Sequence, residues 1–153
     1  MRYALALFLA ALALPPASTA QPGGAPEACK LLSPAELGPI LGAGYASVAP
    51  LGSREMCLYR KSAAELVGLT VVNAPGGAAK TLKEVAAMVS RTQKVNPVEG
   101  LGEGAFWVVS SSTNKMGLHV GKGERRAVIE VVVGGKPDVA AAQKVAKVVL
   151  SHL

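Results

Sequence analysis

Residues able to do acid–base or nucleophilic chemistry are few in this sequence. The histidines are His119 and His152, and Asp138 is the single aspartate. A Ser-His-Asp site would need a serine of 110–112 to meet His119 and Asp138. Asp138 instead precedes an apolar helical stretch that it is expected to cap, and His152 falls in the last turn of that stretch, where a helix favours positive charge. We therefore expect no enzyme, and keep as an alternative a weak hydrolase that uses Ser110, Ser111 or Ser112 with His119.

A glycine-rich stretch leads into the only tryptophan of the chain, in the order Gly100-Leu101-Gly102-Glu103-Gly104-Ala105-Phe106-Trp107. It superficially matches a dinucleotide fingerprint, but that motif lies between a strand and a helix, and the residues that follow here are strand formers. We expect a structural turn that feeds a central strand. Neighbouring strand residues point to opposite faces, so Phe106 or Trp107 enters the core and the other is free to line a groove.

Bare glycine backbone permits close approach of a ligand or peptide. The possible binding residues are therefore Gly100, Gly102, Gly104, Phe106 and Trp107. The alternative is that both aromatic rings are buried, one on each side of the sheet.

The two cysteines, Cys29 and Cys57, form an even pair, which in an exported protein indicates a disulfide. The alternative is two separate buried thiols. Two cysteines without nearby histidines do not make a zinc site, and no other motif calls for a metal or a cofactor.

The N-terminus has the pattern of a secretory signal peptide over residues 1–20. A charged start at Arg2 is followed by an uncharged run from Ala4 to Leu14 and by the small residues Ser18-Thr19-Ala20. The run is too short to span a bilayer, so the mature chain is expected to have no transmembrane anchor. We expect export to the periplasm or the medium, a flexible lead-in over residues 21–28, and a single domain over residues 29–153.

The chain carries 16 Lys and Arg against 10 Asp and Glu, a formal charge of +6. Because these cations are spread along the sequence, they do not indicate nucleic-acid binding. Four basic residues bracket the hairpin expected over residues 116–133 and could meet anionic headgroups or an acidic partner: Lys115, Lys122, Arg125 and Arg126. The alternative is ordinary solvated surface charge.

Hydrophobic periodicity predicts an α+β fold, with an antiparallel-rich sheet and helices packed on it, in the order helix, three strands, helix, three strands, helix. Ser33, Pro34 and Glu36 signal the first helix through a capping box. The expected helices cover about 34–42, 78–93 and 137–153. The expected strands cover about 45–51, 55–61, 66–73, 106–109, 116–121 and 127–133.

The order of short motifs resembles a group of small bacterial secreted proteins and lipoproteins of uncharacterised function, which includes the LpqN-type lipoproteins. The motifs are Cys29-Lys30-Leu31-Leu32-Ser33, then Cys57-Leu58-Tyr59, then the glycine–aromatic strand, and the resemblance that they carry extends over most of residues 29–153. This resemblance implies a PsbP-like fold and a role in envelope-associated binding or assembly, with no catalytic residues to carry over. Many members have a lipobox, which this chain lacks.

These observations favour an exported, non-enzymatic binding or assembly module of the bacterial cell envelope. Its partner would be an unidentified envelope protein or a small ligand. The alternatives are a periplasmic carrier of a small ligand or lipid with a groove near Trp107, and the weak hydrolase described above.

Overall fold

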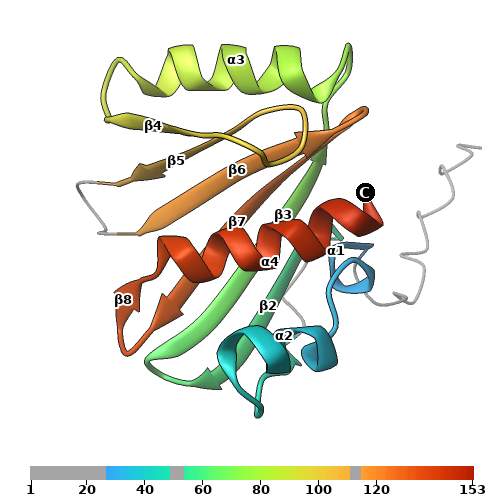
Figure 1. Cartoon of the computed structure of the whole chain (residues 1–153), viewed down its shortest axis with the longest axis vertical. Coiled ribbons are helices and arrows are strands. Elements are labelled where there is room, and N and C mark those ends of the chain that lie inside the picture. The colour runs from blue at the N-terminus through green and yellow to red at the C-terminus, as the bar shows by residue number, and fades with distance from the viewer. Residues whose placement is uncertain (1–26, 49–53, 111–114) are drawn as a thin grey trace, which may run out of the picture.

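The computed structural model describes residues 27–48, 54–110 and 115–153 as an eight-stranded antiparallel sheet with helices packed against it (Figure 1). The predicted α+β fold class is confirmed. The signal peptide predicted over residues 1–20 and most of the predicted lead-in lie outside the described residues. The strands are β1 (Ala46–Val48), β2 (Met56–Ser62), β3 (Glu65–Asn73), β4 (Val95–Val98), β5 (Ala105–Val109), β6 (Met116–Lys122), β7 (Arg125–Val133) and β8 (Lys136–Pro137).

The strands lie in the order β1-β2-β3-β7-β6-β5-β4, and the short β8 pairs with β7. The two longest strands, β3 and β7, are neighbours near the middle, with a register from Leu66↔Val132 to Asn73↔Arg125. β3 is apolar over most of its length, and β7 is rich in β-branched residues, which suits an interior position.

Three helices cover one face of the sheet, which we call the closed face. They are α1 (Glu27–Lys30), α2 (Pro34–Leu41) and α4 (Val139–His152), and Figure 1 shows α4 crossing in front of the central strands with α1 and α2 beside it. Alternate strand residues on this face, such as Leu69 and Ile129, are fully buried in the same core as Val145 of α4. No helix within the described ranges is both long enough and apolar enough to cross a membrane.

A disulfide between Cys29 and Cys57 joins α1 to β2 on the closed face, as predicted. Cys57 is fully buried in the same core as Leu32 and Tyr59. The bond therefore fixes the first helical segments onto the sheet.

Within the described residues, the opposite face carries one helix, α3 (Ala78–Val89). Leu82 of α3 packs with Phe106 and Val108 in a second, smaller apolar cluster. The helix approaches the sheet closely at Gly121, where an added Cβ would lie 2.5 Å from the Ala78 Cβ. Glycine is therefore required at this contact for steric reasons.

Three elements were not predicted: α1, β4 and β8. β4 was missed because Pro97 argues against a strand, yet an edge strand tolerates proline, and β4 is the edge neighbour of β5. The Phe106-Trp107 strand is therefore second from the edge, and the expectation of a central strand is wrong. The predicted flexible lead-in included Glu27 and Ala28, but both belong to α1, and Ala28 is fully buried in the core.

Candidate functional site

Half of the sheet face that carries α3 has no helix over it in the described part of the chain. Alternate residues of β3 and β7 are only half-buried there, whereas their neighbours on the closed face are buried. Met56 of β2 and Val48 of β1, each 42 % exposed, extend the same surface. We call this surface the open half-face, and its residues are Val48, Met56, Leu58, Arg60, Leu66, Thr70, Val72, Val128, Glu130 and Val132.

A hollow of about 300 Å³ lies where α3 ends over the sheet, and we call it the seam hollow. Strand pairing explains its shape, because Gly117 faces Val108 and leaves the floor without a side chain. Two residues at the C-terminal end of α3 and just beyond it, Val89 and Gln93, form one wall. Its full lining is Val89, Gln93, Val108, Ser110, Lys115, Gly117, His119, Val128 and Glu130.

His119 has a fixed orientation beside the floor of the seam hollow. Its ring stacks on Phe106 with centroids 4.6 Å apart and an angle of 9° between the planes. Its Nδ1 lies 3.0 Å from Nη1 of Arg126. Because a guanidinium can only donate, Nδ1 must accept and the ring proton belongs on Nε2. The Nε2 atom lies beside Gly117, 3.6 Å from the position that a Cβ of Gly117 would occupy.

Burial, and after it the charge of Arg126, lowers the pKa of His119 to about 4. The imidazole is therefore neutral near pH 7, and its Nε2–H is a hydrogen-bond donor toward the floor of the hollow.

Arg126 is held among apolar groups without a carboxylate partner in the described residues. Burial lowers its pKa, and its Nε is a buried donor with no hydrogen-bond partner there. Its hydrogen bond goes to the neutral ring of His119. A desolvated cation in this state favours the approach of an acidic group.

The hydrolase alternative requires Ser110, His119 and Asp138 to work together. Ser110 and His119 do line the same hollow. Asp138, however, caps α4, where its Oδ1 accepts a hydrogen bond of 2.9 Å from the backbone N of Ala141. Arg126 occupies the Nδ1 side of His119, where a triad needs an acid, and this cation makes the imidazole a weaker base. Ser111 and Ser112 lie outside the described residues.

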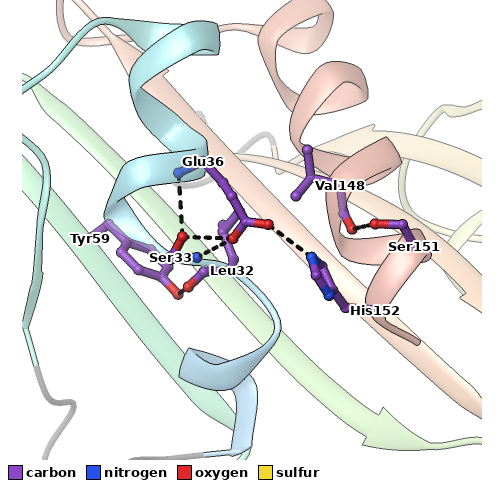
Figure 2. Close-up of polar contacts among 7 residues, drawn as sticks. All are labelled: Leu32, Ser33, Glu36, Tyr59, Val148, Ser151 and His152. Atoms are coloured by element: carbon purple, nitrogen blue, oxygen red, sulfur yellow. Dashed lines mark hydrogen bonds and ion pairs between the residues drawn. The ribbon is translucent and has the colours of Figure 1, made fainter.

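A second group of polar residues joins α2 to the end of α4 (Figure 2). Ser33 Oγ donates to Glu36 Oε2 at 2.7 Å, and His152 Nε2 lies 2.8 Å from Glu36 Oε1. Hydrogen bonds from Ser33, and after them the contact with His152, hold the pKa of Glu36 below its usual value. Glu36 stands between the serine and the histidine, so Ser33 contacts a carboxylate with a lowered pKa, which is a weak base, and not the imidazole of His152.

The same region contains Tyr59, whose hydroxyl donates to the backbone oxygen of Leu32 (Figure 2). Burial raises the pKa of Tyr59 to about 12, so the hydroxyl stays protonated. These contacts are a capping box and an interhelical clamp, which makes their role structural.

The predicted glycine–aromatic residues are placed on both sides of the sheet. Phe106 is 4 % exposed under α3, whereas Trp107 packs half-buried against the closed-face core, so the predicted opposite orientation is confirmed. Gly100, Gly102 and Gly104 all have positive φ angles, and a Cβ on Gly102 would come within 2.3 Å of the Gly121 oxygen. Trp107 does not line the seam hollow.

The four predicted basic residues do not form one patch. Lys122 donates to the Leu150 oxygen at 3.0 Å, and Arg125 pairs with Glu27 at 3.1 Å near the turn of the β6–β7 hairpin. Arg126 faces the other side and contacts His119, and Lys115 lies at the far end of β6 in the seam hollow.

Sequence reasoning missed the partnership of His119 with Arg126 and the role of Glu130. The one available signal was the alternation of Gly117, His119 and Gly121, which indicated a bare side of a strand. Within the described ranges, no three His, Cys, Asp or Glu side chains are grouped so that they could hold a metal ion.

Comparisons of the chain with protein-family models, with curated proteins and with solved structures gave no match. The resemblance to LpqN-type lipoproteins therefore stays a prediction, and the function proposed below rests on the chain's own geometry.

Proposed function

We propose that this chain is an exported, non-enzymatic binding or assembly module of the cell envelope, and that it binds its partner through the open half-face. Export is supported by the signal-peptide pattern of residues 1–20. The Cys29–Cys57 disulfide supports the same conclusion, because such bonds persist in oxidising compartments such as the periplasm.

One observation carries the proposal, namely the unequal covering of the two faces of the sheet. Three helices bury the closed face, but α3 leaves the β2-β3-β7 side of the other face uncovered in the described part of the chain. Half-buried aliphatic residues such as Leu58, Leu66 and Val132 lie on that side. The exposed side chains of Val48 and Met56 adjoin them, and a cluster of partly exposed apolar residues is typical of an interaction site.

The charges on and beside this surface favour an acidic partner. Arg60 lies exposed on the open half-face and Arg126 lies beside it, whereas Glu130 is the one acid among the open half-face residues. We therefore propose a protein partner that presents aliphatic side chains together with Asp or Glu. A lipid surface is the competing outcome of the test below.

The absence of enzymatic activity is part of the proposal. It is supported by the position of Arg126 at Nδ1 of His119 and by the capping role of Asp138. Turnover that depends on His119 would contradict it.

The experiment uses two exposed methionines as matched positions. Met56, 42 % exposed, lies on the open half-face, and Met88, 61 % exposed, lies on α3. Each is replaced in turn by a photo-crosslinking amino acid, and the mature protein is irradiated in its native envelope. We expect one specific protein adduct from position 56 and none from position 88.

The captured protein, once purified, should shift the methyl NMR signals of Leu58 and Val132 and leave that of Val145 in the core unchanged. Equal crosslinking from both positions, or only lipid adducts from position 56, would contradict the proposed protein partner.

A second candidate function is a periplasmic carrier of a small ligand, with its site in the seam hollow instead of near Trp107. The observation in its favour is a hollow of about 300 Å³ with aliphatic walls and a few convergent polar groups, which is the usual construction of a ligand site. Native mass spectrometry of the protein purified from the envelope should then detect a bound small molecule.

A further inference from the structure

We propose that the seam hollow binds a small zwitterion of the amino-acid type, with adjacent ammonium and carboxylate groups and a short aliphatic side chain. This inference goes beyond the proposed protein partner and names a ligand class for the second candidate function, the carrier with its site in the seam hollow. Free amino acids and the residues at a peptide terminus share parts of this chemistry, and the experiment below distinguishes them.

The floor of the hollow is bare backbone at Gly117. Its neighbours on the same face surround it: His119 on one side along β6, Lys115 on the other side, and Val108 opposite it on β5. A Cβ at Gly117 would reach 3.4 Å from Val128 Cγ1 and 3.6 Å from His119 Nε2. The absence of a side chain therefore creates the space in which a ligand would meet the imidazole.

Two hydrogen-bond donors, from His119 and Lys115, indicate that the ligand carries a carboxylate. The hydrogen bond from Arg126 fixes the His119 tautomer with its proton on Nε2, next to the floor. Lys115 lines the hollow from the other side with an ammonium group. A carboxylate between them would accept from both, and one of the two bonds would be charge-assisted.

One hydrogen-bond acceptor, the carboxylate of Glu130, indicates that the ligand also carries an ammonium group. Glu130 lines the hollow from β7, and its carboxylate makes no hydrogen bond or ion pair with any of the described residues. Lys115, which lines the same hollow, is equally without an ion pair in that part of the chain. The Glu130 carboxylate leans toward β3, where its Oε2 lies 3.8 Å from the position that a Cβ of Gly68 would occupy, so it stands at the rim of the hollow. Unpaired charges of opposite sign around one hollow are complementary to a ligand that carries both signs.

The remaining walls are aliphatic. Val89 from α3, Val108 from β5 and Val128 from β7 enclose the space next to the polar groups. A volume of about 300 Å³ is at the small end of the range for ligand sites, which suits a single amino acid better than a larger molecule.

The experiment measures binding of three probes to the mature protein by calorimetry: L-leucine, N-acetyl-leucine and leucinamide. The acetylated probe lacks the ammonium group and the amide lacks the carboxylate. We expect leucine to bind at least about tenfold more tightly than either blocked probe, because each loses one hydrogen bond to a charged group. A fourth probe, the dipeptide Leu-Leu, separates the two charges and tests the peptide source.

Three variants locate the binding. Glu130→Gln and Lys115→Met should each weaken leucine by about tenfold or more and should leave one blocked probe unaffected, N-acetyl-leucine for the first and leucinamide for the second. Gly117→Ala removes no polar group but fills the floor and should abolish binding. Gly38→Ala is the control, because a Cβ there meets nothing within 4 Å.

Equal affinity for all three probes, no binding of any probe, or retention of leucine binding in Gly117→Ala would overturn the inference. If no probe binds but the position 56 adduct still forms, the ligand class alone is wrong. If leucine binds as expected and no adduct forms, the protein partner alone is wrong.

Discussion

The two faces of the same sheet are built in opposite ways. On the closed face, α1, α2 and α4 bury a continuous aliphatic layer, and the Cys29–Cys57 disulfide fixes its N-terminal part. On the other face, α3 buries a cluster around Phe106 and Val108. The rest of that face is half-buried or exposed and includes Glu130, with Arg126 beside it. Adjacent residues of one strand therefore serve different purposes: those on the closed face hold the fold, and those on the open half-face remain available to a partner.

The largest expected effect concerns the closed face. Replacing Cys29 and Cys57 together by serine should lower the free energy of unfolding by about 3 to 4 kcal/mol, because the unfolded chain regains the freedom of a loop whose ends are 28 residues apart. Urea unfolding under non-reducing conditions measures it. A loss below about 1 kcal/mol would show that α1 is not held by this bond.

The next prediction uses two neighbouring valines of β7. Val131 is fully buried on the closed face, and Val132 is half-buried on the open half-face. Val131→Ala should cost about 2 to 3 kcal/mol through lost burial and a cavity, and Val132→Ala less than about 1 kcal/mol. Equal losses in urea unfolding would remove the distinction between the faces.

The third prediction concerns pH and the α3 side of the sheet. The His119 pKa is lowered from 6.5 to about 4 in the fold, so between these values the unfolded chain binds a proton that the native protein does not. Stability should therefore fall as pH falls, by about 2 kcal/mol between about pH 7 and about pH 5. His119→Gln should remove this part of the pH dependence, as measured by urea unfolding at a series of pH values. If the free energy of unfolding of this variant depends on pH as in the wild type, His119 is not the group responsible.

The smallest effect is expected at the clamp between α2 and α4. Ser33→Ala removes the capping hydrogen bonds to Glu36 and should cost about 1 kcal/mol in thermal or urea unfolding. The binding of leucine should be unaffected, since Ser33 lies on the closed-face side. A change in leucine affinity would indicate coupling between the two faces.

Much of the fold was predictable from local signals. The capping box at Ser33 and Glu36 located α2, Asp138 marked the start of α4, and the β-branched run of β7 indicated an interior strand. The disulfide was predicted from an even pair of cysteines in a chain that is expected to be exported. The strands that were missed, β4 and β8, are short, and both contain a proline that argues against a strand.

The candidate site was less predictable because it depends on strand register. Phe106, His119 and Val128 form one row across three strands, and no local pattern relates them. The sequence drew attention to Trp107 as the single tryptophan, but its position in β5 places it against the closed-face core. Glu130 lies in a largely apolar strand. A carboxylate is tolerated there because its face of the sheet is not covered by a helix in the described residues, and this could not be known from the sequence.

The most direct test of the account compares stability and partner binding in two variants, each carrying the crosslinker at position 56. Val132→Lys changes the open half-face, and Val131→Ala changes the closed-face core of the same strand. The account predicts that Val132→Lys unfolds close to the wild-type temperature and loses the adduct, and that Val131→Ala unfolds at a lower temperature but keeps the adduct while folded. A folded Val132→Lys protein that crosslinks as well as the wild type would contradict the assignment of the open half-face as the binding surface.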